Sequence, residues 1–157
     1  MDAGGKPLLQ VRRGMGNLDY LDNEDLVDFD TLIDIESSGN YLAKNPKSGA
    51  LGLTQIMPEG KKGALDEWNN YHPKEKKTDA DLLDPQQNMR IGHWYMYKRI
   101  PQMLKHFKKP VTTENMLHAY NGGIGKVVDG VLPAETKKYI EKYKTKTIEK
   151  ELLRQLK

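Results

Sequence analysis

The sequence predicts a mainly α protein. Apolar residues recur at helical spacing in several segments, helix-capping residues precede those segments, and no segment alternates apolar and polar residues long enough to indicate a strand. The 157 residues suffice for one domain that buries about two-thirds of its unfolded surface. The absence of cysteine excludes a disulfide framework, a thiol nucleophile and cysteine-based zinc sites.

The first predicted helix runs from Leu26 to Ser38, with Asp22 or Asn23 as its N-cap and Gly39 as its stop. One face carries three apolar residues and an acid at the spacing i, i+3, i+4, i+7, namely Phe29, Leu32, Ile33 and Glu36. Seven residues turn a helix by about 700°, so Glu36 returns to within about 20° of the start of this stripe. A carboxyl on a buried face is either paired or kept partly protonated, and a general acid requires the second state.

The rest of the chain is predicted to alternate loops and helices. We expect a loop at residues 40–50, an irregular apolar segment at residues 52–58, and short helical pieces with loops at residues 59–81. Later helices are expected at residues 85 to about 100, from Thr112 or Thr113 to Gly122-Gly123, from Pro133 to Tyr143, and from Thr147 to Lys157.

The helix at residue 85 has the clearest start signal. Asp84 is placed as its N-cap, Pro85 as its first residue, and Gln87 as the third residue that completes a reciprocal cap. Pro101 is expected to end or kink this helix, because proline lacks the N–H that the helix needs. Gly92 inside it indicates that a neighbouring helix approaches closely.

Composition and charge narrow the class of protein. The 25 basic and 22 acidic residues give a net charge of +3, which does not by itself indicate nucleic acid. The N-terminal residues show no apolar run typical of a signal peptide, and no segment approaches the roughly 20 apolar residues of a membrane span. The expected organisation is an extended or partly disordered lead-in at residues 1–20, a helical domain at residues 21–143, and a C-terminal helix at residues 144–157.

Five motifs occur in a fixed order along the chain. They are Glu36-Ser37-Ser38-Gly39-Asn40, Gly52-Leu53-Thr54-Gln55-Ile56-Met57-Pro58, Asp84-Pro85-Gln86-Gln87-Asn88 with Gly92 and Tyr95, Ala119-Tyr120-Asn121-Gly122-Gly123-Ile124-Gly125-Lys126-Val127, and Glu135-Thr136-Lys137-Lys138-Tyr139. Over about Leu26 to Tyr143 the chain resembles lytic transglycosylases with an SLT domain, of the lysozyme-like superfamily. The resemblance implies a helical domain with a substrate cleft that cleaves the β-1,4 link between N-acetylmuramic acid and N-acetylglucosamine in peptidoglycan.

The resemblance also implies the roles of individual residues, without a metal or an organic cofactor. Glu36 would be the single acid/base catalyst, and Ser37 would lie near the N-acetyl group or the glycosidic oxygen. The other implied site residues are Gln55 and Met57 as cleft lining, Tyr120 and Asn121 as groups that orient the catalytic carboxyl or the muramic sugar, and Glu135 and Tyr139 further along the groove. The chain departs from the common pattern at Thr54, where methionine is frequent, and at Gly122-Gly123 in place of Ala-Gly; both are interpreted as lining positions.

The chemistry of the residues supports this reading. Glycosidic cleavage requires protonation of a poor leaving oxygen, and lysozyme does this with a glutamate whose pKa is raised to about 6. A retaining hydrolase normally needs a second carboxylate about 5 Å from the first, and an inverting hydrolase needs it about 6.5–9.5 Å away. Asp34 is turned about 200° from Glu36, and Glu59 and Glu135 remain candidates that resemble no family nucleophile. A one-carboxylate site fits a substrate-assisted route that ends in a 1,6-anhydromuramic product.

Two other functions stay open. A lysozyme-type muramidase would admit water to the same site, and an inactive wall-binding or assembly module of a virion or secretion machine would keep the cleft without catalysis. The expected partners are peptidoglycan glycan strands rather than nucleic acid or membrane, with virion or secretion-machine proteins as further partners. The expected location is the bacterial cell wall or periplasm, reached by virion delivery or through a leader absent from this sequence.

Trp68, Tyr71 and Trp94 are expected to pack in the core more than to stack on sugars.

Overall fold

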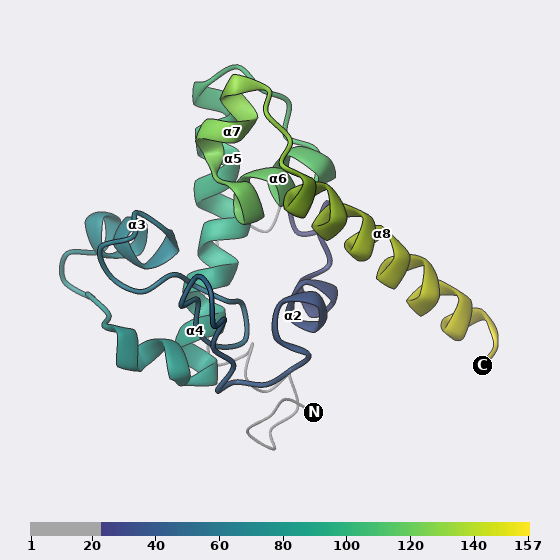
Figure 1. The fold of residues 1–157 in the computed structure, drawn as a ribbon, viewed down its shortest axis with the longest axis horizontal. Coiled ribbons are helices and arrows are strands. Elements are labelled where there is room, and N and C mark those ends of the chain that lie inside the picture. The colour runs from purple at the N-terminus through teal and green to yellow at the C-terminus, as the bar shows by residue number, and fades with distance from the viewer. Residues whose placement is uncertain (1–22) are drawn as a thin grey trace. The chain divides into compact units, whose positions relative to one another are not determined.

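The computed structural model describes residues 23–157, and this part of the chain is helical without a strand (Figure 1). Its helices are α2 (Phe29–Ser37), α3 (Ala64–Tyr71), the 3₁₀ helix η2 (Asp79–Leu83), α4 (Pro85–Trp94), the π-helix η3 (Tyr95–Arg99), α5 (Ile100–His106), α6 (Thr113–Gly122), α7 (Ile124–Asp129) and α8 (Ala134–Gln155). The mainly α fold predicted from the sequence is confirmed. The lead-in predicted at residues 1–20 lies outside the described residues.

The chain divides into two compact units. Among the described residues, unit 1 comprises residues 36–95, and unit 2 comprises residues 23–35 together with residues 96–157. The chain passes from unit 2 to unit 1 inside α2, after Ile35, and returns after Tyr95, where α4 gives way to η3. Among residues 23–157, unit 1 is therefore one continuous segment, whereas unit 2 is assembled from two segments.

Helix α4 begins in unit 1 as the sequence predicts. The carboxylate of Asp84 accepts hydrogen bonds from the backbone N–H groups of Gln86 and Gln87 at 2.9 and 3.2 Å, and Pro85 occupies the first helical position. The predicted reciprocal cap from Gln87 is wrong. The N–H of Asp84 donates instead to the carbonyl of Asp81 at 3.0 Å, because η2 ends directly before α4 and supplies that acceptor.

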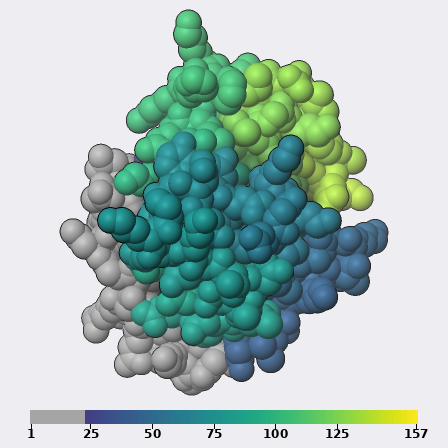
Figure 2. Space-filling model, turned by 90° about the vertical axis from the view of Figure 1, so that its left-hand side faces the viewer, coloured from purple at the N-terminus to yellow at the C-terminus, as the bar shows by residue number. Residues whose placement is uncertain are grey.

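An aromatic cluster joins α3 to α4 within unit 1. Trp68 and Trp94 are almost fully buried and meet edge to face, with ring centroids 5.4 Å apart. His72 stacks on Trp68 at 3.7 Å, and the Arg90 guanidinium lies 5.2 Å from the centre of the same ring. The packing role expected for both tryptophans is confirmed, while Tyr71 remains half-exposed. Figure 2 views the molecule from the side on which α3 lies, with the exposed, charged segment that follows α3 on this face.

The helix expected to end or kink at Pro101 continues through it. The backbone stays helical from Pro85 to His106, and the five-residue π-helix η3 precedes the proline. Proline removes the N–H that would bond the carbonyl four residues earlier, that of Tyr97. The side chain of Asn23 donates to this carbonyl at 3.2 Å, so the freed acceptor is satisfied. Asn23 therefore serves the carbonyl of Tyr97 instead of acting as the predicted N-cap of α2.

Helix α2 begins three residues later than predicted, and Asp28 caps it. The Asp28 carboxylate accepts from the N–H and the hydroxyl of Thr31 at 3.1 and 2.6 Å. The predicted stripe of Phe29, Leu32 and Ile33 is buried, but so are Thr31 and Ile35. The buried surface of α2 is therefore wider than the single stripe predicted from the periodicity.

The C-terminal half of unit 2 differs from the sequence prediction in two ways. Helix α7 was not predicted, and it follows Gly123, whose φ of 90° ends α6. The two helices predicted on either side of residues 144–146 are one 22-residue helix, α8. Lys144, Thr145 and Lys146 interrupt the apolar pattern but not the helix, because lysine has high helix propensity and the preceding turns are already packed at Tyr139 and Tyr143. The N-cap role of Thr112 is confirmed by its bond from the N–H of Asn115 at 3.1 Å.

Candidate active site

Glu36 lies in the last turn of α2 and is half-buried. The helix ends at the next residue, Ser37, because Ser38 and Gly39 adopt φ values of 54° and 79° that no longer continue a right-handed helix. The hydroxyl of Ser37 accepts a hydrogen bond from the N–H of Gly39 at 3.2 Å, so it takes part in this turn. A buried helix thus ends on a partly accessible carboxyl, which is the placement that a general acid requires.

The loop that carries Gln55 and Met57 is fixed to α4 by Asn88. Antiparallel bridges pair Leu51 with Lys44 and with Ile56, and they fold the loop on itself. Asn88 is fully buried, and its amide oxygen accepts from the N–H and the hydroxyl of Thr54 at 2.9 and 2.6 Å. Its amide nitrogen donates to the carbonyls of Leu51 and Leu82 at 3.0 and 2.9 Å. All four hydrogen-bonding positions of the Asn88 side chain are therefore used inside unit 1.

Two glycines allow this loop to lie directly on α4. A Cβ added at Gly92 would stand 2.4 Å from the hydroxyl of Thr54, and one added at Gly52 would stand 2.3 Å from both the Asn88 amide and the Leu82 carbonyl. Close approach at Gly92 was predicted correctly, but the neighbour is the loop at Thr54 and not a helix. Thr54 was interpreted as lining the cleft, and this is wrong, because its side chain is fully buried and spends its hydroxyl on Asn88.

Gln55 and Met57 follow from this anchored loop. Gln55 has a φ of 54°, and its amide nitrogen donates to the carbonyls of Gly52 and Ala43 at 3.0 and 3.3 Å. The side chain of Gln55 therefore holds the loop together through its nitrogen. Met57 is half-buried, and a Cβ added at Gly63 would stand 3.1 Å from the Cβ of Met57. Their predicted contact with substrate stays a prediction.

The remaining predicted site residues belong to unit 2. Tyr120 and Asn121 are half-buried at the end of α6, Glu135 is exposed in the first turn of α8, and Tyr139 is buried one turn later. The hydroxyl of Thr136 donates to the side-chain oxygen of Asn121 at 2.8 Å. This bond brings the end of α6 and the start of α8 together, so the two predicted pairs of unit 2 share one region of that unit.

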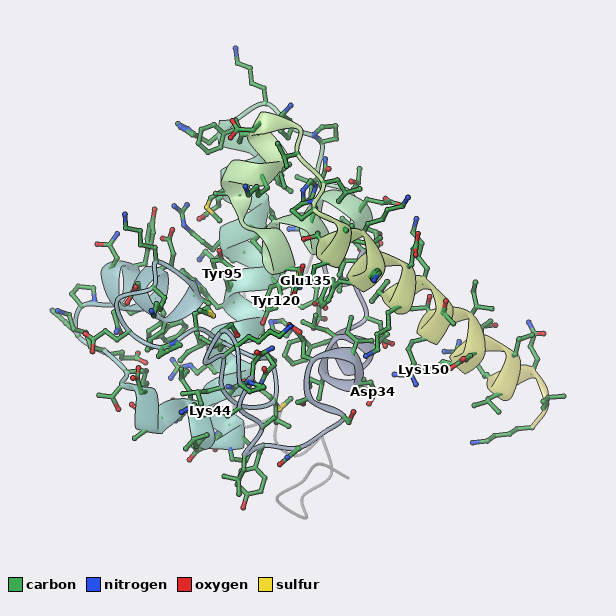
Figure 3. The ribbon with its side chains drawn as sticks, in the orientation of Figure 1. Asp34, Lys44, Tyr95, Tyr120, Glu135 and Lys150 are labelled. Atoms are coloured by element: carbon green, nitrogen blue, oxygen red, sulfur yellow. The ribbon has the colours of Figure 1, made fainter. Side chains whose placement is uncertain are left out.

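The three acidic residues considered as a possible second carboxylate, Asp34, Glu59 and Glu135, lie in different environments. Asp34 forms an ion pair with Lys150 of α8 at 3.1 Å, and the two side chains point toward one another in Figure 3. Asp34 is therefore engaged by α8, a contact that the sequence did not predict. Glu59 is exposed, and its N–H donates to Asp79 at 2.8 Å. Glu135 is exposed at the start of α8.

Sequence reasoning missed the residues that hold the site residues in place. Asn88 and Gly92 stand within a recognised motif, yet only their partners in the folded chain show that they anchor the Gln55 loop. Asp28 and Lys150 were missed because both lie outside the five motifs. Among residues 23–157, no group of His, Asp and Glu side chains is arranged to hold a metal ion. Within the same residues, no helix combines the length and apolar composition needed to cross a bilayer.

The helical fold of the described residues is consistent with a lysozyme-like helical domain. The family model described as transglycosylase SLT domain matches residues 23–147. The chain therefore belongs to the transglycosylase SLT domain family, as its motifs predict. Membership supports a peptidoglycan-degrading function of the lytic transglycosylase type, which acts on the cell wall. Among curated proteins, none matches the chain significantly.

Proposed function

We propose that this chain is a lytic transglycosylase that cleaves the β-1,4 link from N-acetylmuramic acid to N-acetylglucosamine and leaves a 1,6-anhydromuramic end. The observation that supports this most is the placement of Glu36. It is a half-buried carboxyl at the exposed end of a buried helix, while Asp34 of the same helix is engaged by Lys150. A half-buried carboxyl in the last turn of α2 suits an acid/base catalyst that protonates the glycosidic oxygen.

In the proposed mechanism the carboxyl of Glu36 first acts as an acid. It gives its proton to the oxygen that links the two sugars, and the bond from that oxygen to the anomeric carbon of N-acetylmuramic acid breaks. The oxygen of the substrate's own N-acetyl group bonds to the anomeric carbon and carries the developing positive charge, as in substrate-assisted glycosidases. Glu36, now a carboxylate, then removes the proton of the 6-hydroxyl, whose oxygen displaces the acetyl oxygen and closes the 1,6-anhydro ring.

The other predicted residues would bind the glycan. Ser37 follows the catalytic acid and is the nearest hydroxyl in the sequence, and Gln55 and Met57 are presented by the loop that Asn88 anchors. Tyr120 and Asn121 would orient the muramic sugar or the catalytic carboxyl, and Glu135 and Tyr139 would contact the strand further from the cut. The bond from Thr136 to Asn121 supports a shared role for these two pairs, because it fixes α6 to α8 at this point.

Product analysis separates the proposed reaction from hydrolysis. Purified peptidoglycan is digested with the chain, and the soluble fragments are weighed by mass spectrometry. A transglycosylase yields anhydromuramic ends, which are lighter by one water than the reducing ends made by a muramidase. Reducing muramic ends without anhydro ends would show that water enters the site and would replace the proposal by the hydrolase.

The variant Glu36→Gln tests the catalytic role against that of an inactive binding module. Glutamine keeps the size and polarity of the side chain but cannot donate or accept the proton. The rate of product formation should therefore fall at least about 100-fold. Glu59→Gln serves as the control, because Glu59 is an exposed glutamate of unit 1. Both variants should bind sedimented peptidoglycan like the unaltered chain. Full activity of the Glu36 variant would refute the assignment, and an unaltered chain that binds but never cleaves would favour the binding module.

A further inference from the structure

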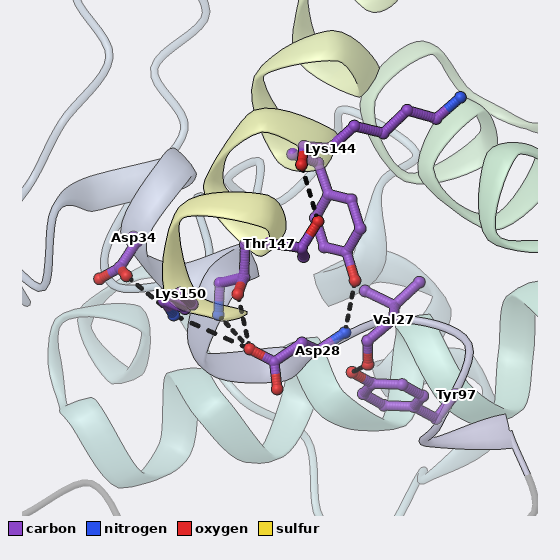
Figure 4. Close-up of polar contacts among 9 residues, drawn as sticks. Val27, Asp28, Asp34, Tyr97, Lys144, Thr147 and Lys150 are labelled. Atoms are coloured by element: carbon purple, nitrogen blue, oxygen red, sulfur yellow. Dashed lines mark hydrogen bonds and ion pairs between the residues drawn. The ribbon is translucent and has the colours of Figure 1, made fainter. Parts of the chain in front are cut away.

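Helix α8 continues past the part of the chain that the family model matches, and the added turns contact α2. The match ends at residue 147, whereas α8 runs to Gln155. Lys150, on the added turns, places its ammonium 3.1 Å from the Asp34 carboxylate and 3.8 Å from the Asp28 carboxylate (Figure 4). One cation therefore joins two acids of unit 2 that are six residues apart, one just before α2 and one near its end.

A second contact from α8 lies on the same face of the helix. The hydroxyl of Tyr143 accepts a hydrogen bond from the N–H of Asp28 at 2.8 Å. Tyr143 and Lys150 are seven residues apart, so they differ in direction by only about 20° around α8. The Tyr143 side chain is buried, and this desolvation raises the pKa of its phenol, which stays neutral and protonated at physiological pH. Both α8 residues thus act on the segment that starts and caps α2.

We propose that Lys150 is a positioning residue for the catalytic carboxyl, because it fixes the rotation of α2 about its own axis. This inference rests on the proposed role of Glu36. Asp34 stands two residues before Glu36 on the same helix. The ion pair that holds Asp34 therefore lies less than one helical turn from Glu36. The capping group Asp28 anchors the other end of the helix, through the same Lys150 and through Tyr143.

The geometry explains why so weak a contact matters for catalysis. Helix α2 has nine residues, and helices of this length are marginal without tertiary contacts. A carboxyl at the end of a side chain lies about 6 Å from the helix axis, so a rotation of about 10° moves it by about 1 Å. A misplacement of 1 Å at a reacting group can reduce the rate by up to about 100-fold. Lys150 and its partners are partly exposed, so their effect on overall stability should be small while their effect on geometry is not.

The test compares Lys150→Met with Lys146→Met on solubilised glycan strands. Lys146 is a matched control, because it is a partly exposed lysine of the same helix whose partner, Glu149 at 3.9 Å, belongs to α8 itself. We expect the Lys150 variant to lower kcat about 3- to 10-fold with KM unchanged within about twofold, and the Lys146 variant to leave both unchanged. Lys150→Arg should restore kcat, since arginine keeps the charge and can reach a carboxylate.

Two further readouts distinguish positioning from a general structural role. Hydrogen exchange at the amides of α2 should be several-fold faster in the Lys150 variant than in the Lys146 variant. The difference in kcat between the unaltered chain and the Lys150 variant should narrow in about 1 M salt, where the Debye length falls to about 3 Å and the ion pairs are screened.

The outcomes separate this inference from the function on which it rests. An active unaltered chain whose kcat is insensitive to Lys150→Met, or equally sensitive to Lys146→Met, overturns the positioning role alone. A change confined to KM, or α2 exchange identical in the two variants, also overturns it. If the unaltered chain cleaves no glycan, or if Glu36→Gln remains fully active, the proposed function itself fails and this inference fails with it.

Discussion

Replacing Asn88 by alanine should cost more stability than any surface substitution in unit 1. The Asn88 side chain is fully buried and makes four hydrogen bonds, two with Thr54 and one each with the carbonyls of Leu51 and Leu82. These bonds join the loop that carries Gln55 to α4 and to the end of η2. Alanine removes all four bonds and leaves their partners buried without the Asn88 side chain.

The size of the effect follows from these contacts. A hydrogen bond contributes about 0.5–1.5 kcal/mol net, and a buried group left without its partner loses about 1–3 kcal/mol. Four bonds therefore give an expected loss of about 3–5 kcal/mol in the free energy of unfolding, a large part of the roughly 5–15 kcal/mol of an ordinary domain. Asn88→Asp should lose about 2–4 kcal/mol, because it keeps the shape but turns the donor toward Leu51 and Leu82 into an acceptor.

Urea unfolding followed by circular dichroism measures both losses, with Asn70→Ala as the control. Asn70 is an exposed asparagine on α3, and its replacement should change stability by less than about 0.5 kcal/mol. The double variant with Thr54→Val should lose less than the sum of the two single variants, because both single variants remove the bond from the Thr54 hydroxyl to Asn88. A loss below about 1 kcal/mol for Asn88→Ala, or strict additivity with Thr54→Val, would refute the account of Asn88 as the anchor of the loop.

Two further predictions concern packing and pH. Gly92→Ala should lower the free energy of unfolding, measured in urea, by about 1–2 kcal/mol. Overpacking against Thr54 costs about 1–3 kcal/mol, which exceeds the gain of up to about 1 kcal/mol in helix propensity. A variant more stable than the unaltered chain would contradict the close contact between Gly92 and Thr54. The pKa of Glu114 is lowered from 4.5 by a hydrogen bond from its own backbone N–H and by Lys144. The ionised Glu114 carboxylate should therefore stabilise the fold at neutral pH, and this stabilisation should disappear as the pH falls through the lowered pKa. Thermal unfolding of Glu114→Gln and the unaltered chain should then differ slightly at pH 7 and coincide in acid, and an equal difference at both pH values would count against this assignment.

The parts of the fold that were predictable are those fixed by neighbouring residues. The start of α4 at Asp84-Pro85, the cap at Thr112 and the end of α6 at Gly123 depend on local backbone groups, and the sequence predicts all three. The helix was predicted to end or kink at Pro101, but it continues. The sequence did not show this, because the carbonyl of Tyr97 that Pro101 leaves free is satisfied by Asn23, 74 residues away from Tyr97. Such long-range compensation leaves no local pattern.

The candidate site shows the same division. Glu36 stood out because an acid shared an apolar stripe, and the family match supports the motifs around it. Thr54 was misinterpreted because its buried partner, Asn88, lies 34 residues further along the chain. Lys150 gave no signal, since one lysine among many on a basic helix looks like any solvated charge until its distance to Asp34 is known.

The discontinuous make-up of unit 2 sets an order of events during synthesis. The described part of unit 1 is the single segment of residues 36–95, so the contacts within that segment can form once residue 95 has left the ribosome. The bond between Asp28 and Tyr143 spans 115 residues, and the contact of Lys150 with Asp34 closes a loop of similar length. The helix that bears Glu36 is therefore translated well before the α8 residues that contact it. If Lys150 positions the proposed catalytic acid, full positioning of that acid has to wait until α8 has been made.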